Sequence, residues 1–106
     1  MSYFFHFYNF QLQIYKITLL YFYSFTCQTC FIQLPQLENS IKNNNNISLY
    51  CIDIDSNQKI VEDMDITSIP LLQIYKDTEK KKDFYGTDII IENYMDTINT
   101  LLLAHK

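Results

Sequence analysis

The sequence predicts an α/β domain in which a central mixed β-sheet carries helices on both faces. Short apolar runs, typical of strands buried on both faces, alternate with segments whose apolar residues recur every three or four positions, as in amphipathic helices. Near the C-terminus, two strand-like segments are joined by a short charged link, which requires them to be antiparallel. The expected order along the chain is βαβαβαββα.

The composition indicates one globular domain over residues 1–106. Hydrophobic residues make up 48% of the chain and aromatic residues 16%, enough for a packed core without a framework of disulfides or a structural metal. The net charge is −4 and there is no arginine, so the chain offers no basic face for nucleic acid or anionic lipid. We expect a monomer that binds neither nucleic acid nor membranes.

The N-terminal segment is apolar but does not resemble a cleaved leader. No basic region precedes it, polar residues interrupt it, and no small-residue cleavage site follows. No run of 18 apolar residues is present, so no membrane span is predicted. We expect a strand at Tyr3–Tyr8 and a short helix at Asn9–Tyr15, both retained, followed by the central strand at Ile17–Tyr23.

A helix is expected to start at Cys27, because apolar residues recur at helical spacing from Phe31 to Ile41. Pro35 should kink this helix rather than end it. After an asparagine-rich turn at residues 43–46, the run Ile47–Asp53 predicts a strand buried on both sides.

In the C-terminal half, Asp55 and Ser56 are candidate N-caps for a short helix at Asn57–Asp63. Strands are predicted at Leu71–Lys76 and Lys82–Tyr85.

The charged turn Asp77–Lys81 should join these two strands, with the lysines at 80–82 near the tip of the hairpin. A final amphipathic helix is expected at Asp88–Leu103, capped by Thr87 or Asp88.

Cys27 and Cys30 are the candidate catalytic residues. Two cysteines separated by two residues can form a disulfide where the backbone turns into a helix, and a helix N-terminus favours the nucleophilic thiolate of the first. Three cysteines are too few for a secreted disulfide framework, so a dithiol in a reducing compartment is expected. Half a zinc site has the same spacing, although His6 and His105 lack ligand spacing. Cys51 is expected to be a small buried residue of a core strand.

Together these landmarks resemble the thioredoxin family across nearly the whole chain. Cys27-Gln28-Thr29-Cys30 follows an apolar strand, and Pro35 lies five residues after the second cysteine. Ile52-Asp53-Ile54-Asp55 ends the next strand, Thr67-Ser68-Ile69-Pro70 precedes another, and Gly86 lies before the last helix. The resemblance implies the thioredoxin fold and thiol–disulfide exchange without a cofactor or metal.

The resemblance also implies a role for each matching residue. Cys27 would be the attacking thiol and Cys30 the resolving thiol, while Ile69 would offer backbone hydrogen bonds to a substrate beside a cis Pro70. The chain departs from the family at Tyr21 and Cys51, which replace a buried aspartate and its lysine partner. Without that aspartate, the usual proton acceptor for the resolving thiol is missing.

The function expected is that of a protein-disulfide oxidoreductase in cell redox homeostasis. Its partners would be disulfide-containing proteins and a reductase such as thioredoxin reductase, and its compartment the cytoplasm. The alternative is a redox-weak module that binds extended peptides beside the cis-proline. A glutathione-dependent, glutaredoxin-like enzyme fits less well, because the motif lacks the Cys-Pro-Tyr-Cys pattern.

Overall fold

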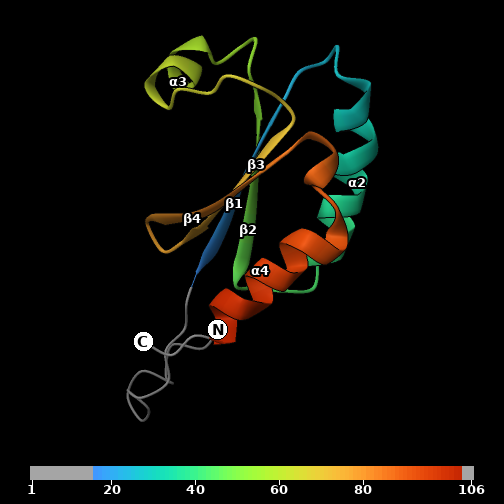
Figure 1. Cartoon of the computed structure of the whole chain (residues 1–106), viewed down its shortest axis with the longest axis vertical. Coiled ribbons are helices and arrows are strands. Elements are labelled where there is room, and N and C mark those ends of the chain that lie inside the picture. The colour runs from blue at the N-terminus through green and yellow to red at the C-terminus, as the bar shows by residue number, and fades with distance from the viewer. Residues whose placement is uncertain (1–15, 104–106) are drawn as a thin grey trace.

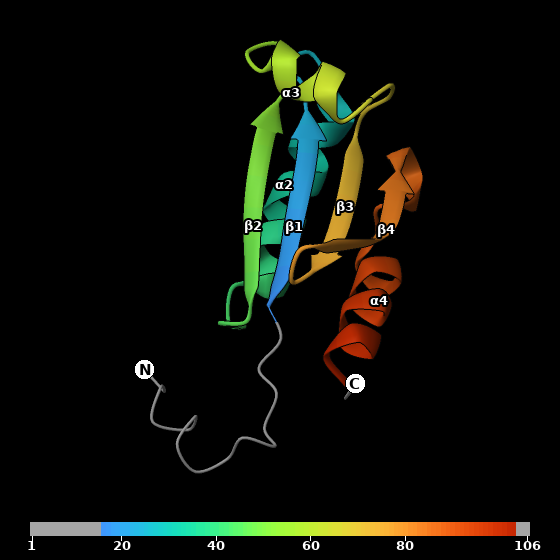
Figure 2. The ribbon, with the colours of Figure 1, turned by 90° about the vertical axis from the view of Figure 1, so that its left-hand side faces the viewer.

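The computed structural model describes residues 16–103, which form a four-stranded mixed sheet with helices on both sides (Figure 1). The strands are β1 (Ile17–Tyr23), β2 (Ile47–Asp53), β3 (Leu71–Lys76) and β4 (Glu79–Tyr85). Their order in the sheet is β2-β1-β3-β4. β1 is parallel to β2 and antiparallel to β3, and β3 and β4 form an antiparallel hairpin (Figure 2). The predicted mixed α/β architecture is therefore confirmed.

The helices lie on the two sides of this sheet. α2 (Gln28–Ile41) and α4 (Ile91–Leu103) cover one face, and the short α3 (Gln58–Asp63) lies on the other side near one end of the strands (Figure 1). A short 3₁₀ turn, η1 (Gly86–Asp88), joins β4 to α4. α2 continues through Pro35, as the sequence predicted.

β1 is the central strand that its apolar sequence predicts. It lies between β2 and β3, and Ile17, Leu19 and Tyr21 are fully buried. These side chains pack against apolar residues of α2, β3 and α4, including Leu37, Ile74 and Ile98. This core between the sheet and the two long helices fixes where the carboxyl end of β1 and the start of α2 lie.

The burial predicted for β2 is wrong, although its bounds are correct. Among residues 16–103, β2 has a neighbouring strand only at β1, and both Tyr50 and Cys51 are exposed. An apolar run predicts a strand, but it does not reveal whether the strand has one or two neighbours. Cys51 is therefore not the buried core residue that the sequence suggested.

The hairpin is tighter than expected, and β4 begins at Glu79 instead of Lys82. Asp77 adopts a positive φ of 57°, which an aspartate tolerates and which lets two residues reverse the chain. The lysines at 80–82 thus belong to β4 and not to the turn. Among residues 16–103, β4 has a neighbouring strand only at β3. Exposed lysines suit such a strand, because they oppose pairing with other chains.

The predicted N-caps are also corrected. α3 begins after Asn57, whose side chain makes no capping bond, and not after Asp55 or Ser56. The segment before α4 forms η1 first, so α4 starts at Ile91 instead of Asp88.

The strand predicted at Tyr3–Tyr8, the helix predicted at Asn9–Tyr15, and both histidines lie outside the described residues. Within residues 16–103, no helix is long and apolar enough to cross a membrane.

Candidate active site

Two connecting segments meet at the end of the sheet where β1 stops. β1 leads through residues 24–27 into α2, and α3 leads through residues 64–70, the Pro70 loop, into β3 (Figures 1 and 2). Phe22 of β1 pairs with Leu71 of β3, so Pro70 lies beside the end of β1. The topology therefore brings the CxxC segment and the Pro70 loop to the same edge.

Cys27 and Cys30 are joined by a disulfide, with their Cα atoms 5.3 Å apart. Cys27 occupies the N-cap of α2, as predicted, and its Sγ accepts a hydrogen bond from the backbone N–H of Cys30 at 3.2 Å. Cys27 is half-buried, whereas Cys30 is 1% exposed. The two sulfurs thus differ in access, and the more accessible one lies where backbone N–H groups favour a thiolate.

A polar cluster holds the segment that precedes Cys27. The buried Ser24 hydroxyl donates to Asp55 Oδ2 at 3.1 Å and accepts from the backbone N–H of Thr26 at 3.2 Å. The Thr26 hydroxyl lies 3.0 Å from Ser24 Oγ and donates to it, since the Ser24 hydrogen is directed at Asp55. The backbone N–H of Ile54 also donates to the carbonyl of Tyr23 at 2.9 Å. The residue after β2 and the segment before the disulfide are therefore tied together.

The Pro70 loop has the conformation that the resemblance implied. The Ile69–Pro70 peptide bond is cis, Pro70 is buried and Ile69 is half-buried. The Pro70 carbonyl accepts a hydrogen bond from the backbone N–H of Gly86 at 2.9 Å. Gly86 has a positive φ of 56°, a conformation that favours glycine at this position.

Tyr21 is buried beneath the disulfide, as its position in the apolar strand suggested. Its hydroxyl donates to Gln33 Oε1 at 2.8 Å and lies 3.3 Å from the carbonyl oxygen of Cys30. Burial is the main cause that raises the pKa of Tyr21 above its ordinary value of 10.0, and Cys51 on the neighbouring strand adds to the shift. Tyr21 therefore stays protonated near neutral pH and acts there as a hydrogen-bond donor.

Gln33 is a site residue that the sequence reasoning missed. It is 8% exposed, and its Nε2 donates to the carbonyl oxygen of Gly86 at 2.9 Å. A signal was present, because Gln33 lies three residues after Cys30 and four before Leu37, on the buried face of α2. A polar residue at such a position needs partners inside the protein.

Cys51 lies opposite Tyr21 in the pairing of β1 with β2. It is a free cysteine and is exposed. Neighbouring protein atoms still desolvate the thiol enough to raise its pKa, and Glu38 of α2 raises it further. A raised pKa keeps this thiol protonated and weakly nucleophilic near neutrality.

Aromatic rings cover the surface next to the disulfide. Tyr23, Phe25 and Phe31, which we call the aromatic cluster, have ring centroids 5.6 to 6.1 Å apart. Phe25 is 65% exposed and Phe31 43% exposed. Phe25 precedes Cys27 by two residues and Phe31 directly follows Cys30, so apolar surface adjoins both ends of the motif.

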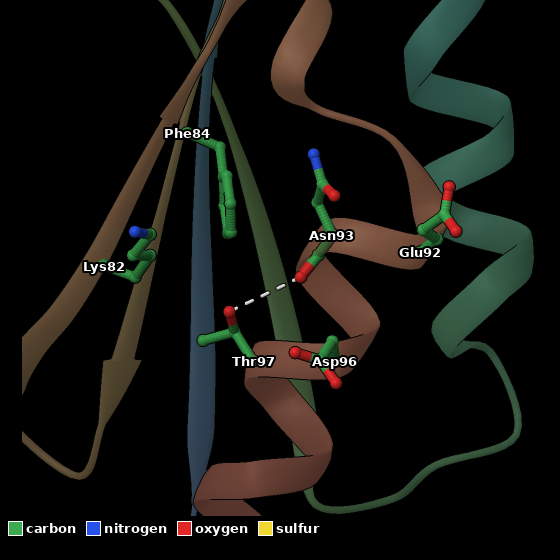
Figure 3. A pocket seen from close by; sticks show the side chains of 6 residues that line it. All are labelled: Lys82, Phe84, Glu92, Asn93, Asp96 and Thr97. Carbon is green, nitrogen blue, oxygen red and sulfur yellow. Dashed lines mark hydrogen bonds between the residues drawn. The ribbon is translucent and has the colours of Figure 1, made fainter.

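A separate pocket of about 560 Å³ lies between β4 and α4 (Figure 3). Its lining is mostly polar and comes from Lys82, Phe84, Glu92, Asn93, Asp96 and Thr97. None of these residues is a thiol or belongs to the CxxC segment or the Pro70 loop. Over residues 16–103, no group of three or more His, Cys, Asp or Glu side chains could hold a metal ion.

Comparisons with known proteins agree with this geometry. The family model described as thioredoxin matches residues 5–97. A search among curated proteins finds no match. Solved structures with the same fold include a point mutant of thioredoxin from Halobacterium salinarum, which is 22% identical, has a TM-score of 0.72, and covers 84% of this chain and 77% of its own.

Two further structures are thioredoxins from parasites. Thioredoxin from Fasciola hepatica is 21% identical with a TM-score of 0.71, over 86% of this chain and 82% of its own. Oxidised thioredoxin from Plasmodium falciparum is 20% identical with a TM-score of 0.69, over 82% of each chain. Since the family model spans most of the sequence and the Cys27–Cys30 disulfide is in place, this chain belongs to the thioredoxin family and carries the cysteine pair of a thiol–disulfide oxidoreductase.

Proposed function

We propose that this protein is a protein-disulfide reductase that works through the Cys27–Cys30 pair. The observation that carries the proposal is the asymmetry of the two sulfurs: Cys27 is partly accessible at the N-terminus of α2, whereas Cys30 is almost fully buried behind it. Such an arrangement separates an attacking thiol from a resolving thiol.

The reduced protein would begin with the Cys27 thiolate. It attacks one sulfur of a target disulfide, forming a mixed disulfide and releasing the other target sulfur as a thiolate, which takes up a proton. The Cys30 thiol then loses its proton to water and attacks Cys27 Sγ. The Cys27–Cys30 disulfide forms, the second target sulfur leaves as a thiolate, and two electrons have passed to the target. A partner reductase, such as thioredoxin reductase, returns two electrons to the pair.

Substrate binding is assigned to the surface around Cys27. The backbone of Ile69, beside the cis Pro70, would hydrogen-bond an extended segment of the target. The aromatic cluster supplies exposed apolar surface at the same place, which suits protein targets whose cysteines have apolar neighbours. A reducing compartment such as the cytoplasm would keep the pair in its working dithiol state.

The reduction potential of the Cys27–Cys30 pair, measured against a glutathione series, tests this proposal. A potential more negative than the glutathione couple, about −240 mV, is expected of a reductase, and a value above about −180 mV would indicate an oxidant instead. Reduction of insulin disulfides should accompany the negative potential. The Cys27→Ser variant is the control and should reduce no insulin.

One observation favours a second candidate, a redox-weak module that binds extended peptides beside Pro70. Tyr21 takes the place of the family's buried aspartate, and its raised pKa prevents it from accepting a proton from Cys30 near neutrality. Insulin reduction no faster than that by the Cys27→Ser variant, together with measurable peptide binding, would select this second candidate.

A further inference from the structure

Gln33 uses both ends of its side-chain amide inside the protein. Its Oε1 accepts from the Tyr21 hydroxyl at 2.8 Å, and its Nε2 donates to the Gly86 carbonyl at 2.9 Å. A backbone carbonyl can only accept, so the nitrogen of the amide must face Gly86 and the oxygen must face Tyr21. The orientation of this side chain is therefore fixed by its partners.

Gly86 extends the connection to the substrate-binding loop of the proposed function. Its carbonyl accepts from Gln33, and its backbone N–H donates to the Pro70 carbonyl at 2.9 Å. Four residues from four segments thus form one series of hydrogen bonds, from β1 through α2 and η1 to the Pro70 loop. We call this series the Tyr21–Pro70 hydrogen-bond series; its members are Tyr21, Gln33, Gly86 and Pro70.

We infer that Gln33 is a positioning residue for disulfide exchange, because it holds the Pro70 loop at a fixed place relative to the helix that carries Cys27 and Cys30. The inference rests on the proposed function. A target segment bound by the backbone beside Pro70 meets Cys27 correctly only if the loop and the helix keep their relative position. Gln33 is the one member of the hydrogen-bond series whose side chain joins that helix to η1.

Burial alone does not account for this arrangement. The site of Gln33 on the buried face of α2 could hold an apolar residue, and a buried polar group is costly unless all its bonds are made. The Tyr21 hydroxyl contacts α2 at a second point besides Gln33, since it also lies 3.3 Å from the Cys30 carbonyl. The polar connection therefore includes the backbone of the second cysteine itself.

The test compares two disulfides that differ in whether they can use the Pro70 loop. Insulin presents a peptide backbone beside its disulfide, whereas cystamine has none. In Gln33→Leu, the KM for insulin should rise about three- to tenfold, the size expected when one or two hydrogen bonds are lost. Its kcat for insulin and its second-order rate with cystamine should stay within about twofold of the unmodified protein. Tyr21→Phe keeps the bond from Gln33 to Gly86 and should raise the KM for insulin less than Gln33→Leu does.

Tyr94→Phe is the matched control. Tyr94 is a second buried tyrosine, and its hydroxyl forms a hydrogen bond of 3.1 Å with the Ser40 hydroxyl between α2 and α4. It does not belong to the Tyr21–Pro70 hydrogen-bond series. Its removal should lower the melting temperature without changing the KM for insulin. A double variant, Tyr21→Phe with Gln33→Leu, replaces the polar pair by apolar groups; it should recover stability while its KM stays high.

The outcomes separate this inference from the proposed function. If Gln33→Leu slows insulin and cystamine equally, or changes the KM no more than Tyr94→Phe does, Gln33 is a packing residue only and the inference is overturned. If Gln33→Leu does not fold, the double variant decides in its place, and an unchanged KM there overturns the inference. Failure of the unmodified protein to reduce either disulfide would contradict the proposed function instead.

Discussion

Cys27 and Cys30 lie three residues apart but experience different surroundings. The first accepts a backbone hydrogen bond at the N-cap of α2, whereas the second is 1% exposed beneath it. In the reduced protein at neutral pH, iodoacetamide should therefore modify Cys27 at least tenfold faster than Cys30, because both access and thiolate character favour the first sulfur. Mass spectrometry of peptides from timed samples measures the two rates.

Cys51 must be removed from this experiment, since it is exposed and free. The Cys51→Ser background provides the control and should leave the two rates unchanged. In that background, Cys30→Ser should accumulate a mixed disulfide with an oxidised target, and Cys27→Ser should not. Equal alkylation rates, or trapping by Cys27→Ser, would reverse the roles assigned to the two thiols.

The raised pKa of Tyr21 predicts how the stability of the fold depends on pH in the alkaline range. Burial raises its pKa in the folded protein above the ordinary value of 10.0, with a smaller contribution from Cys51. Below about pH 10, Tyr21 is protonated in both the folded and the unfolded chain and adds no pH dependence. Above that pH the unfolded chain releases the proton first, so stability falls as pH rises.

Tyr21→Phe lacks this titration, so its melting temperature should fall less than that of the unmodified protein between about pH 9 and about pH 11. Tyr94 also has a pKa raised by burial, but it is present in both proteins and cancels in the comparison. If the melting temperatures of the two proteins fell in parallel over this whole pH range, Tyr21 would ionise equally easily in the folded and the unfolded state.

At the scale of elements, the segment between β1 and α2 depends on Ser24. This residue is 4% exposed, and its hydroxyl joins Asp55 to the backbone of Thr26. Ser24→Ala should lower the free energy of unfolding by about 1 to 2 kcal/mol, because it removes the partly buried hydrogen bonds that join Ser24 to Asp55 and to Thr26. Denaturant unfolding of the oxidised protein measures this loss.

Ser56→Ala is the control, since the Ser56 hydroxyl bonds Asp53 at 2.9 Å on the exposed surface. It should leave the unfolding midpoint unchanged. A loss of stability in Ser56→Ala as large as in Ser24→Ala would mean that the Ser24 cluster is not what holds the segment before Cys27.

The elements differ in how far the sequence could predict them. β1, β2 and β3 have the expected bounds, because long apolar runs between polar residues mark strands clearly. The sequence predicts the start of β4 too late, at Lys82 instead of Glu79, because three consecutive lysines do not resemble a strand until its outer position in the sheet is known. The exposure of Cys51 could not be predicted either, because it depends on how the surrounding elements cover the two faces of β2.

Prediction from the sequence has the same limit at the site, where it finds local motifs but misses contacts between residues far apart in the chain. The CxxC motif and the proline before β3 are local signals, and their spacing in the chain was enough to find them. Gln33 becomes a site residue only through Tyr21 on β1 and Gly86, 53 positions further along the chain. Such a partner depends on the tertiary packing of three elements, which no local pattern reveals.

The whole molecule should keep its fold when the disulfide is reduced. The core between the sheet, α2 and α4 contains large, fully buried side chains such as Leu19, Leu37 and Ile74. We expect their burial to hold the fold together without the bond between Cys27 and Cys30. A disulfide that closes so short a loop also restricts the unfolded chain little. Far-ultraviolet circular dichroism of the protein in excess reductant should match that of the oxidised protein, with a cooperative thermal transition in both.

The same samples distinguish a redox pair from a structural one. Zinc bound by Cys27 and Cys30 would stabilise the reduced fold, and a chelator would then unfold it. We expect the melting temperature of the reduced protein to be the same with and without a chelator, and the purified protein to contain no stoichiometric zinc. Unfolding on reduction, or on chelation, would show that the cysteines hold the structure together, because a dithiol that cycles in catalysis must leave the fold intact in both of its states.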